Sequence, residues 1–210
     1  MTVPFFSVII CTYQRAHLIH RALESLVLQQ EHDWEAIIID DGSTDDTESA
    51  VQKYIDGDER FRYFRNDHAG VAKSRNTGIG HAKGLFVTFL DSDDEYHADH
   101  LSSRREMLLS NTDVMLLHGG VEIIGDAMVR DRFDPEQWIH LDECVSGGTF
   151  VVRRDLFSRV GLCSELKYGD DADFFERVAS LGVMIARTDH PSYRYYLVLP
   201  DALTRTYGTT

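Results

Sequence analysis

The acidic turn DSDD is the strongest chemical signal in the sequence. Asp91 and Asp93 are alternate residues that directly follow the apolar run 85–90, so their carboxylates can converge on one point. Hard divalent cations such as Mg²⁺ take oxygen ligands, commonly one or two carboxylates together with substrate phosphates. A solvated turn that caps the following helix is the competing interpretation of DSDD taken by itself.

A second acidic turn favours a cation site. Asp40 and Asp41 end the apolar run 34–39, which predicts another strand of the same sheet. The two turns then lie at one sheet edge, where several like charges crowded together need a cation to offset them.

Three further signals lie elsewhere in the chain. Asp171 belongs to YGDDADFFER, where it is either a carboxylate that suits the positive end of a helix or a general base that takes a proton from a hydroxyl. Gly147 and Gly148 form either a bend before a strand or a place where the backbone approaches a ligand closely. Arg15 and Arg75 are either solvated surface cations or the electrostatic complement of a bound phosphate.

Apolar patterns in the first half predict the elements that position these residues. Short continuous runs predict strands, and apolar residues at helical spacing predict helices. Strands are expected at 5–11, 34–39, 61–64 and 85–90, and helices at 18–27, from a cap at Ser43 or Thr44 to about 55, and at 71–82. The alternation indicates an α/β fold whose mostly parallel sheet is covered by helices on both faces, with ligands at the carboxyl ends of the strands.

The second half is less regular. It is expected to hold a helix at 99–109, a strand at 114–124, a loop or lid at 125–143, a strand within 146–153, and helices at 155–160 and 171–181. A chain of 210 residues corresponds to about one domain. We therefore expect a single domain with an annex in its second half.

Composition narrows the class of protein. The 21 basic and 35 acidic residues give a net charge of −14, which disfavours nucleic acid and anionic lipid as partners. Cys11, Cys144 and Cys163 are an odd number without metal-ligand spacing, in a chain too large to need a disulfide framework, which favours a reducing cytosol. The sequence shows neither an apolar run of about 18 residues nor a basic leader, so we expect a cytoplasmic chain without a transmembrane segment.

The order of the motifs resembles that of a known family. A resemblance to family 2 glycosyltransferases, which have the GT-A fold with its Rossmann-like sheet, is carried by six segments: SVIICTYQR, IIIDDGSTDDT, GVAKSRNTGIGHAKG, VTFLDSDDEY, SGGTFVVRRDLF and YGDDADFFERV. It extends from Ser7 to about Tyr196. The resemblance implies a metal-dependent inverting enzyme that moves one sugar from a nucleotide-sugar, with a UDP-sugar favoured, to an acceptor hydroxyl.

The resemblance also implies roles for individual residues. On the nucleotide side, it implies a pocket lined by Cys11, Thr12, Tyr13 and Arg15, uracil recognition by Asp41 with help from Asp40, and Arg75 beside the diphosphate. On the sugar side, it implies Asp93 and Asp91 as the holders of Mg²⁺ or Mn²⁺, with Asp91 also beside the ribose, a donor-sugar wall of Gly147 and Gly148, and Asp171 as the general base. Asp170 stands where the family's acidic pair begins with glutamate.

These roles divide the domain into a nucleotide-binding half, residues 1–95, and an acceptor-side half, residues 96–210. The acceptor is expected to be a glycan, a lipid-linked compound or another hydroxyl compound, and contact with the inner face of the membrane is left open. The chain lacks the QxxRW motif of processive synthases, which favours the addition of a single sugar.

Two alternatives come from other classes. One is a degenerate sugar-nucleotide-binding module, against which the intact Asp93 and Asp171 argue. The other is a sugar nucleotidyltransferase, whose glycine-rich loop after the first strand has no counterpart in CTYQRAH.

Overall fold

Two central strands carry the most apolar stretches of the first half. In the computed structural model, which describes residues 3–166 and 168–198, β1 (Phe6–Thr12) and β2 (Trp34–Asp40) are buried along almost their whole length. They pair in parallel, from Phe6 opposite Trp34 to Thr12 opposite Asp40. Strands buried on both faces are typical of parallel sheets covered by helices, so the continuous apolar runs predicted this arrangement correctly.

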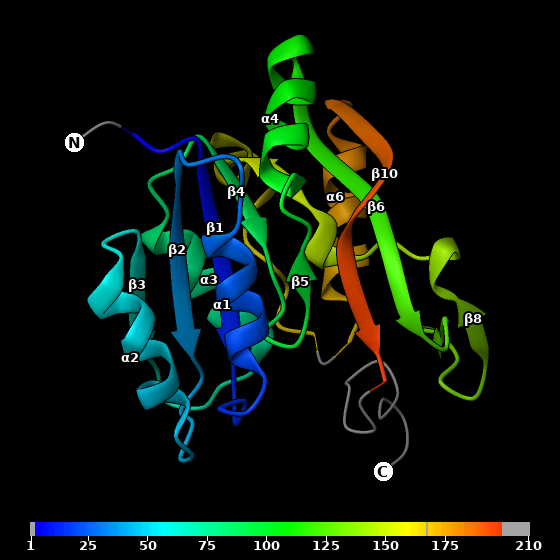
Figure 1. The fold of residues 1–210 in the computed structure, drawn as a ribbon. Helices are drawn as coiled ribbons and strands as arrows, with labels where there is room; N and C mark the ends of the chain where they lie inside the picture. The colour runs from blue at the N-terminus through cyan, green and yellow to red at the C-terminus, as the bar shows by residue number, and fades with distance from the viewer. Residues whose placement is uncertain (1–2, 167, 199–210) are drawn as a thin grey trace.

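These strands belong to an eight-stranded sheet with the spatial order β3-β2-β1-β4-β9-β6-β10-β5 (Figure 1). Its other members are β3 (Phe61–Arg65), β4 (Phe86–Phe89), β5 (Glu95–Tyr96), β6 (Val114–Gly125), β9 (Val151–Arg153) and β10 (Met184–Leu197). The first four strands in this order are parallel, while β9 and β5 run antiparallel to their neighbours. The mostly parallel α/β sheet expected from the sequence is confirmed.

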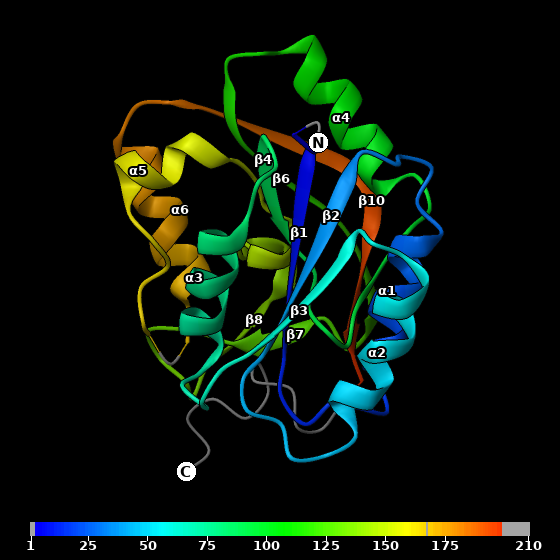
Figure 2. The ribbon, with the colours of Figure 1, turned by 90° about the vertical axis from the view of Figure 1, so that its left-hand side faces the viewer.

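Helices cover both faces of the sheet (Figure 2). One face carries α1 (Ile19–Val27), α2 (Thr47–Gly57) and α4 (His100–Ser110). The other carries α3 (Val71–His81), α5 (Phe157–Val160) and α6 (Asp170–Ser180). Among residues 3–166 and 168–198, no helix combines the length and the apolar character that a membrane span requires.

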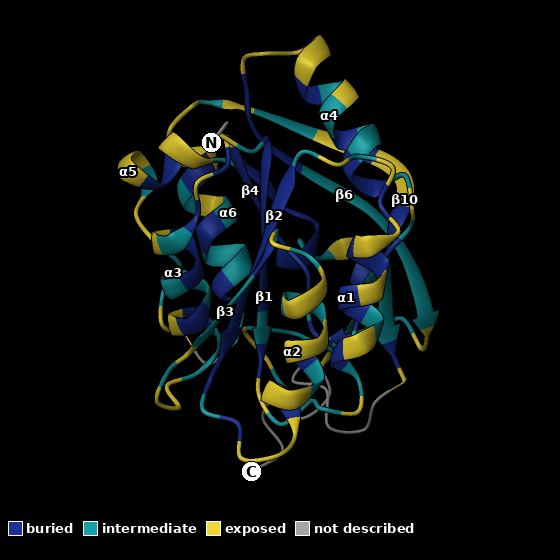
Figure 3. Cartoon of the chain, turned by 60° about the vertical axis from the view of Figure 1, so that its left-hand side comes forward, coloured by how far each residue is buried: buried dark blue, intermediate teal, exposed yellow. Residues whose placement is uncertain are grey.

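The helices turn their buried sides to the sheet and their exposed sides to solvent (Figure 3). In α1, Ile19, Ala22, Leu23 and Leu26 are fully buried, at the helical spacing visible in the sequence. Fully burying one large aliphatic side chain contributes about 1.5–3 kcal/mol. The core on both faces thus fixes the strand ends on which the site residues stand.

The loop predicted at 125–143 is wrong in part, because the segment contains a small second sheet. β7 (Met128–Arg130) and β8 (Trp138–His140) pair antiparallel, and a 3-10 turn follows at Leu141–Glu143. Val129 packs in one buried cluster with Leu141 and Leu197. Strands of three residues are too short to show an alternating pattern, so no periodic signal marks them in the sequence.

Two further features differ from expectation. The sequence predicted no counterpart of β10, whose residues mix exposed and buried positions and whose pairing with β6 shifts register at two places. The cap predicted for α2 at Ser43 or Thr44 is also wrong, because the helix begins at Thr47. The hydroxyl oxygens of Ser43 and Thr44 instead accept hydrogen bonds from the backbone and side-chain nitrogens of Gln14, each at 2.9 Å.

Candidate active site

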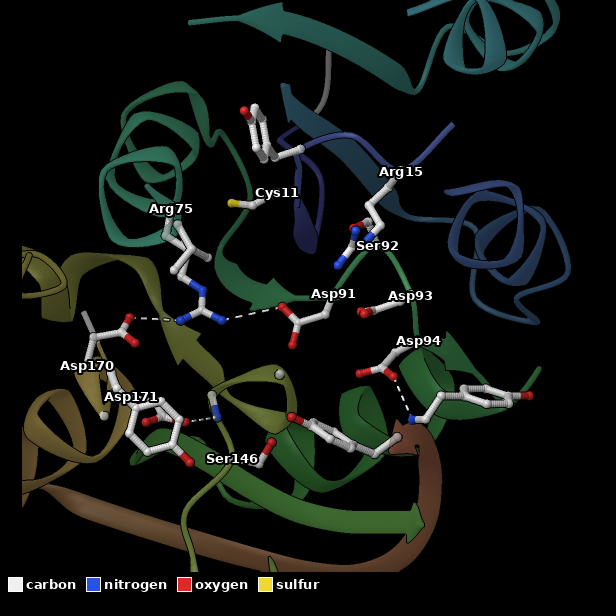
Figure 4. A pocket seen from close by; sticks show the side chains of 18 of the residues that line it. Cys11, Arg15, Arg75, Asp91, Ser92, Asp93, Asp94, Ser146, Asp170 and Asp171 are labelled. Atoms are coloured by element: carbon white, nitrogen blue, oxygen red, sulfur yellow. Dashed lines mark hydrogen bonds and ion pairs between the residues drawn. The ribbon is translucent and has the colours of Figure 1, made fainter. Parts of the chain in front are cut away.

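The carboxyl ends of β1 and β4 open onto a cavity of about 550 Å³ (Figure 4). Ligands bind at this edge of open α/β sheets. Other walls come from the 3-10 turn Gly147–Thr149 and from the start of α6. The cavity is lined by Cys11, Tyr13, Gln14, Arg15, Val71, Arg75, Asp91, Ser92, Asp93, Asp94, Ser146, Gly147, Gly148, Tyr168, Gly169, Asp170, Asp171, Tyr195 and Tyr196.

The acidic turn after β4 forms one side of the cavity. Asp91, Asp93 and Asp94 all line it, and the backbone oxygen of Asp93 accepts a hydrogen bond from Arg21 Nη1 at 2.8 Å. Burial raises the pKa of Asp94 well above its ordinary value, and the charges of Asp91 and Asp93 raise it further. Negative charge is therefore crowded at this edge of the sheet.

The turn has the ligand chemistry of a hard cation. The described part of the chain holds no cluster of three or more His, Cys, Asp or Glu side chains that could bind a metal by itself. Magnesium ions are, however, commonly bound by one or two carboxylates together with substrate phosphates. Asp91 and Asp93 fit that pattern, since both line the same cavity and a bound cation would offset their charges.

Arg75, from α3, lies between the acidic turn and the start of α6 (Figure 4). Its Nη1 is 2.8 Å from Asp170 Oδ2, and its Nη2 is 3.4 Å from Asp91 Oδ1. Burial by itself would lower the pKa of Arg75, but the adjacent Asp170 and Asp91 raise it well above its ordinary value. The guanidinium therefore stays charged and links two acidic segments of the site.

Asp171 stands at the start of α6 with both carboxylate oxygens held by the backbone. Oδ2 accepts a hydrogen bond from Gly147 N at 3.0 Å, and Oδ1 accepts one from Ala172 N at 2.8 Å. Burial raises the pKa of Asp171, Asp170 raises it further, and Arg75 with the two backbone hydrogen bonds offsets part of the shift. A carboxylate with a raised pKa is a better proton acceptor, which suits the chemistry of a general base.

The two glycines before β9 are required by close approaches. A Cβ at Gly147 would lie 2.8 Å from Asp171 Cβ, and a Cβ at Gly148 would lie 2.5 Å from the hydroxyl oxygen of Tyr193. Contacts this short force a neighbour to move. Both glycines line the cavity, and the absence of a side chain lets the backbone pass close to Asp171 and to Tyr193.

The residues predicted to lie on the nucleotide side divide into two groups. Tyr13 and Arg15 line the cavity, and the ring of Tyr13 stacks on His68 with centroids 4.2 Å apart. Cys11 also lines it, as a free thiol whose pKa burial raises strongly. Thr12 does not line the cavity and is almost fully buried.

The adjacent acids Asp40 and Asp41 are buried and are not among the residues that line the cavity. Asp40 is fully buried and accepts hydrogen bonds from Ser43 N and the Tyr63 hydroxyl, and its predicted help in nucleotide binding stays a prediction. The carboxylate of Asp41 accepts hydrogen bonds from three donors that position the start of α3, namely Ala69 N, Gly70 N and Ser74 Oγ. Its predicted contact with a uracil base stays a prediction.

A second cavity, of about 300 Å³, adjoins the first. The two share the wall residues Ser146, Tyr168, Gly169, Asp171 and Tyr195. The far side of the second cavity is built by β7, β8 and the turn between them. Asp171 therefore borders both cavities, an arrangement that the sequence could not reveal because the hairpin residues carry no motif.

Comparisons with solved structures define the class of fold. The chain superposes on S. aureus TarS 1-349 in complex with UDP-GlcNAc with a TM-score of 0.79, at 23% identity over 96% of this chain and 61% of that one. It also matches the mannosyltransferase PcManGT from Pyrobaculum calidifontis in complex with GDP-Man and Mn²⁺, with a TM-score of 0.76, at 20% identity over 97% of this chain and 59% of that one. At these identities the likeness shows the fold alone, which is the GT-A type.

Sequence comparison identifies the family to which the chain belongs. The model of glycosyl transferase family 2 matches residues 7–160, and the chain belongs to that family. It is 34% identical over 134 residues, 63% of this chain, to the Escherichia coli UDP-Glc:alpha-D-GlcNAc-diphosphoundecaprenol beta-1,3-glucosyltransferase WfgD. It is 42% identical over 103 residues, 48% of this chain, to the GalNAc(5)-diNAcBac-PP-undecaprenol beta-1,3-glucosyltransferase of Campylobacter jejuni. The chain spans 52% of the first relative's length and 33% of the second's.

Proposed function

We propose that this protein is a metal-dependent inverting glycosyltransferase that transfers one sugar from a UDP-sugar to an acceptor hydroxyl. The observation that carries the proposal is the position of Asp171, which borders both cavities and lies across Arg75 and Asp170 from the acidic turn. One cavity then takes the donor, and the other admits the acceptor. The Asp171 carboxylate lies at the boundary between the two cavities, where the sugar is transferred from the donor to the acceptor.

The donor side holds the diphosphate. Asp91 and Asp93 would hold Mg²⁺ or Mn²⁺, which when bound neutralises charge on the leaving diphosphate. Arg75 adds a fixed positive charge that stays in place during the reaction, which is the preorganised stabilisation that developing charge requires. Gly147 and Gly148 form the wall against which the donor sugar rests.

On the acceptor side, Asp171 accepts a proton. An acceptor hydroxyl in the second cavity donates its proton to Asp171 as its oxygen attacks the anomeric carbon, and the bond from that carbon to the diphosphate oxygen breaks. Attack from the face opposite the leaving group inverts the anomeric configuration. General base catalysis of this kind contributes typically about 10²–10⁴-fold in rate.

Uracil is the proposed nucleobase of the donor, and Asp41 is the proposed acceptor for its imide N–H. The support is that the E. coli relative uses UDP-Glc and that TarS binds UDP-GlcNAc, as their names state. Asp41 lies next to the cavity through its hydrogen bonds to Ala69 and Gly70, which directly precede the lining residue Val71. PcManGT, in contrast, binds GDP-Man, so GDP is the matched competitor.

The acceptor is proposed to be a glycan or a lipid-linked saccharide, because both named relatives carry diphosphoundecaprenol or PP-undecaprenol acceptors in their names. We place the protein in the cytoplasm, at the inner face of the membrane where such an acceptor is reached. The three cysteines are free thiols, the state that a reducing cytoplasm maintains.

Calorimetry with a nucleotide panel tests the proposal. We expect UDP and UDP-sugars with Mn²⁺ to bind at least about tenfold more tightly than GDP, and we expect slow release of UDP from the preferred UDP-sugar with water as acceptor. Tighter binding of GDP would overturn the uridine assignment. Tight binding of every UDP-sugar without any UDP release would identify a binding module instead of an enzyme.

A further inference from the structure

Asp94 differs from the other acids of the turn in where its carboxylate is held. Its Oδ2 accepts a hydrogen bond from the Tyr193 hydroxyl at 2.8 Å, and its Oδ1 accepts one from Tyr196 N at 2.8 Å. Both donors belong to β10, which lies about a hundred residues further along the chain. The last acid of DSDD therefore ties the acidic turn to this strand instead of presenting a free oxygen to the cavity.

The hydroxyl of Tyr193 meets three parts of the site. It donates to Asp94, it accepts a hydrogen bond from Asp91 N at 3.3 Å, and it lies 2.5 Å from where a Cβ at Gly148 would be. The Tyr193 side chain is fully buried, and its ring packs edge-on against Tyr96. A single hydroxyl group thus supports both ends of the acidic turn and the glycine wall.

Neighbouring residues of β10 reinforce this attachment. Arg194 bridges Glu95 and Glu122 through its Nη1 and Nε, and the hydroxyl of Tyr196 donates to Glu95. β10 also pairs with β5, which directly follows the turn. β10 lies beyond residue 160, where the match to the family model ends, so no part of that match assigns it a role.

We infer that Tyr193 is a positioning residue that fixes the acidic turn in the conformation in which Asp91 and Asp93 bind a divalent cation together with a nucleoside diphosphate. The inference rests on the proposed function for the cation and the diphosphate. Its physical basis is that the hydroxyl holds the Asp91 amide and the Asp94 carboxylate at once. Partners of this kind, which orient metal ligands, typically change metal affinity by about 10–100-fold when they are removed.

Tyr193→Phe tests the inference, with Tyr96→Phe as the matched control. Tyr96 is an equally buried neighbour whose hydroxyl bonds to Phe89 O and Thr88, outside the acidic turn. UDP affinity is measured with Mn²⁺ and with chelator, and amide hydrogen exchange is followed at Asp91. For Tyr193→Phe we expect the Mn²⁺-dependent gain in UDP affinity to fall about tenfold or more, the affinity in chelator to hold within about twofold, and exchange at Asp91 to accelerate.

Gly148→Ala is a second variant that reaches the same hydroxyl, because its methyl group displaces Tyr193, and it should show the same accelerated exchange. An unchanged Mn²⁺ gain and unchanged exchange in Tyr193→Phe, or the same losses in Tyr96→Phe, would overturn the inference. If the wild-type protein shows no Mn²⁺ gain, the metal part of the proposed function fails. In that case, the rate of amide hydrogen exchange at Asp91 in Tyr193→Phe is the only measurement that decides whether Tyr193 positions the turn.

Discussion

The guanidinium of Arg75 and the carboxylate of Asp170 form an ion pair at 2.8 Å, in which both side chains are largely buried. The same guanidinium reaches Asp91 on its other side. This pair connects the segment proposed to hold the diphosphate with the segment that carries the proposed base. Asp170, which stands where the family's acidic pair begins with glutamate, is thus paired with an arginine of α3.

Arg75→Gln should move the pH profile of the reaction. Arg75 lowers the pKa of Asp171, so its removal raises that pKa and shifts the acidic limb of kcat for UDP-sugar hydrolysis to higher pH. The variant should also lose about 3–5 kcal/mol of stability, because a buried carboxylate loses its partner. Arg75→Lys keeps a positive charge and should restore most of the profile, whereas an unshifted limb in Arg75→Gln would contradict the electrostatic link.

Gly147→Ala should slow turnover more than it weakens donor binding. The added methyl group would lie 2.8 Å from Asp171 Cβ, and the base must move away to relieve the contact. We expect kcat for UDP-sugar hydrolysis to fall about tenfold or more, since small misplacements of a catalytic group are costly. Gly80→Ala in α3 meets no atom within 4 Å and should leave kcat unchanged. Equal kcat values for the two variants would contradict the claim that Gly147 keeps Asp171 in its catalytic position.

Local patterns predicted the strands and helices of the first half of the fold, and most of the residues that they singled out line one cavity. β1 and β2 and the acidic turn could be recognised because continuous apolar runs end in charged residues, and parallel strands bring those ends together. Asp40 shows the limit of such reasoning. The sequence predicts that both adjacent acids follow a strand, but it does not tell that both are buried, and the structure turns Asp40 toward Tyr63 inside the fold.

Contacts between distant segments could not be predicted. Tyr193 meets Asp94 across 99 residues of sequence, through a strand whose mixed pattern, with Pro191 inside it, signals neither a buried nor an alternating strand. The wall of the second cavity depends on three-residue strands that leave no periodicity. These features arise from the packing of the second half and become visible only in three dimensions.

Asp93→Ala should abolish the dependence of UDP binding on metal. Asp91 and Asp93 crowd negative charge where a diphosphate must bind, so UDP needs a cation to offset them. Calorimetry on the wild type should show UDP binding at least about tenfold tighter with Mn²⁺ than with chelator. Asp113→Ala, outside both cavities, is the control and should retain this gain. An undiminished gain in Asp93→Ala would exclude Asp93 from the metal site.

Asp171→Asn should gain stability relative to the wild type as pH rises. Folding raises the pKa of Asp171 above its ordinary value of 3.8, so between the two values the folded state binds more protons than the unfolded state. Wild-type stability therefore falls as pH rises through this window, and the lost contribution is not regained above it. From pH 4 to 8, the melting temperature of the variant should rise relative to that of the wild type. A wild type that gains stability over the variant as pH rises would contradict the raised pKa.

The central claim is that Asp171 is the general base, and the most direct measurement is the rate of UDP release from a UDP-sugar by Asp171→Asn, alongside its affinity for UDP with Mn²⁺. Asparagine keeps the size of the side chain but cannot accept the proton. We expect release to fall about 10²-fold or more while UDP affinity stays within about twofold, because the loss is confined to the transition state. Asp173→Asn removes an ion pair with Arg177 on the same helix and should release UDP at the wild-type rate. Wild-type release by Asp171→Asn would contradict the account and leave Asp170 as the next candidate for the base.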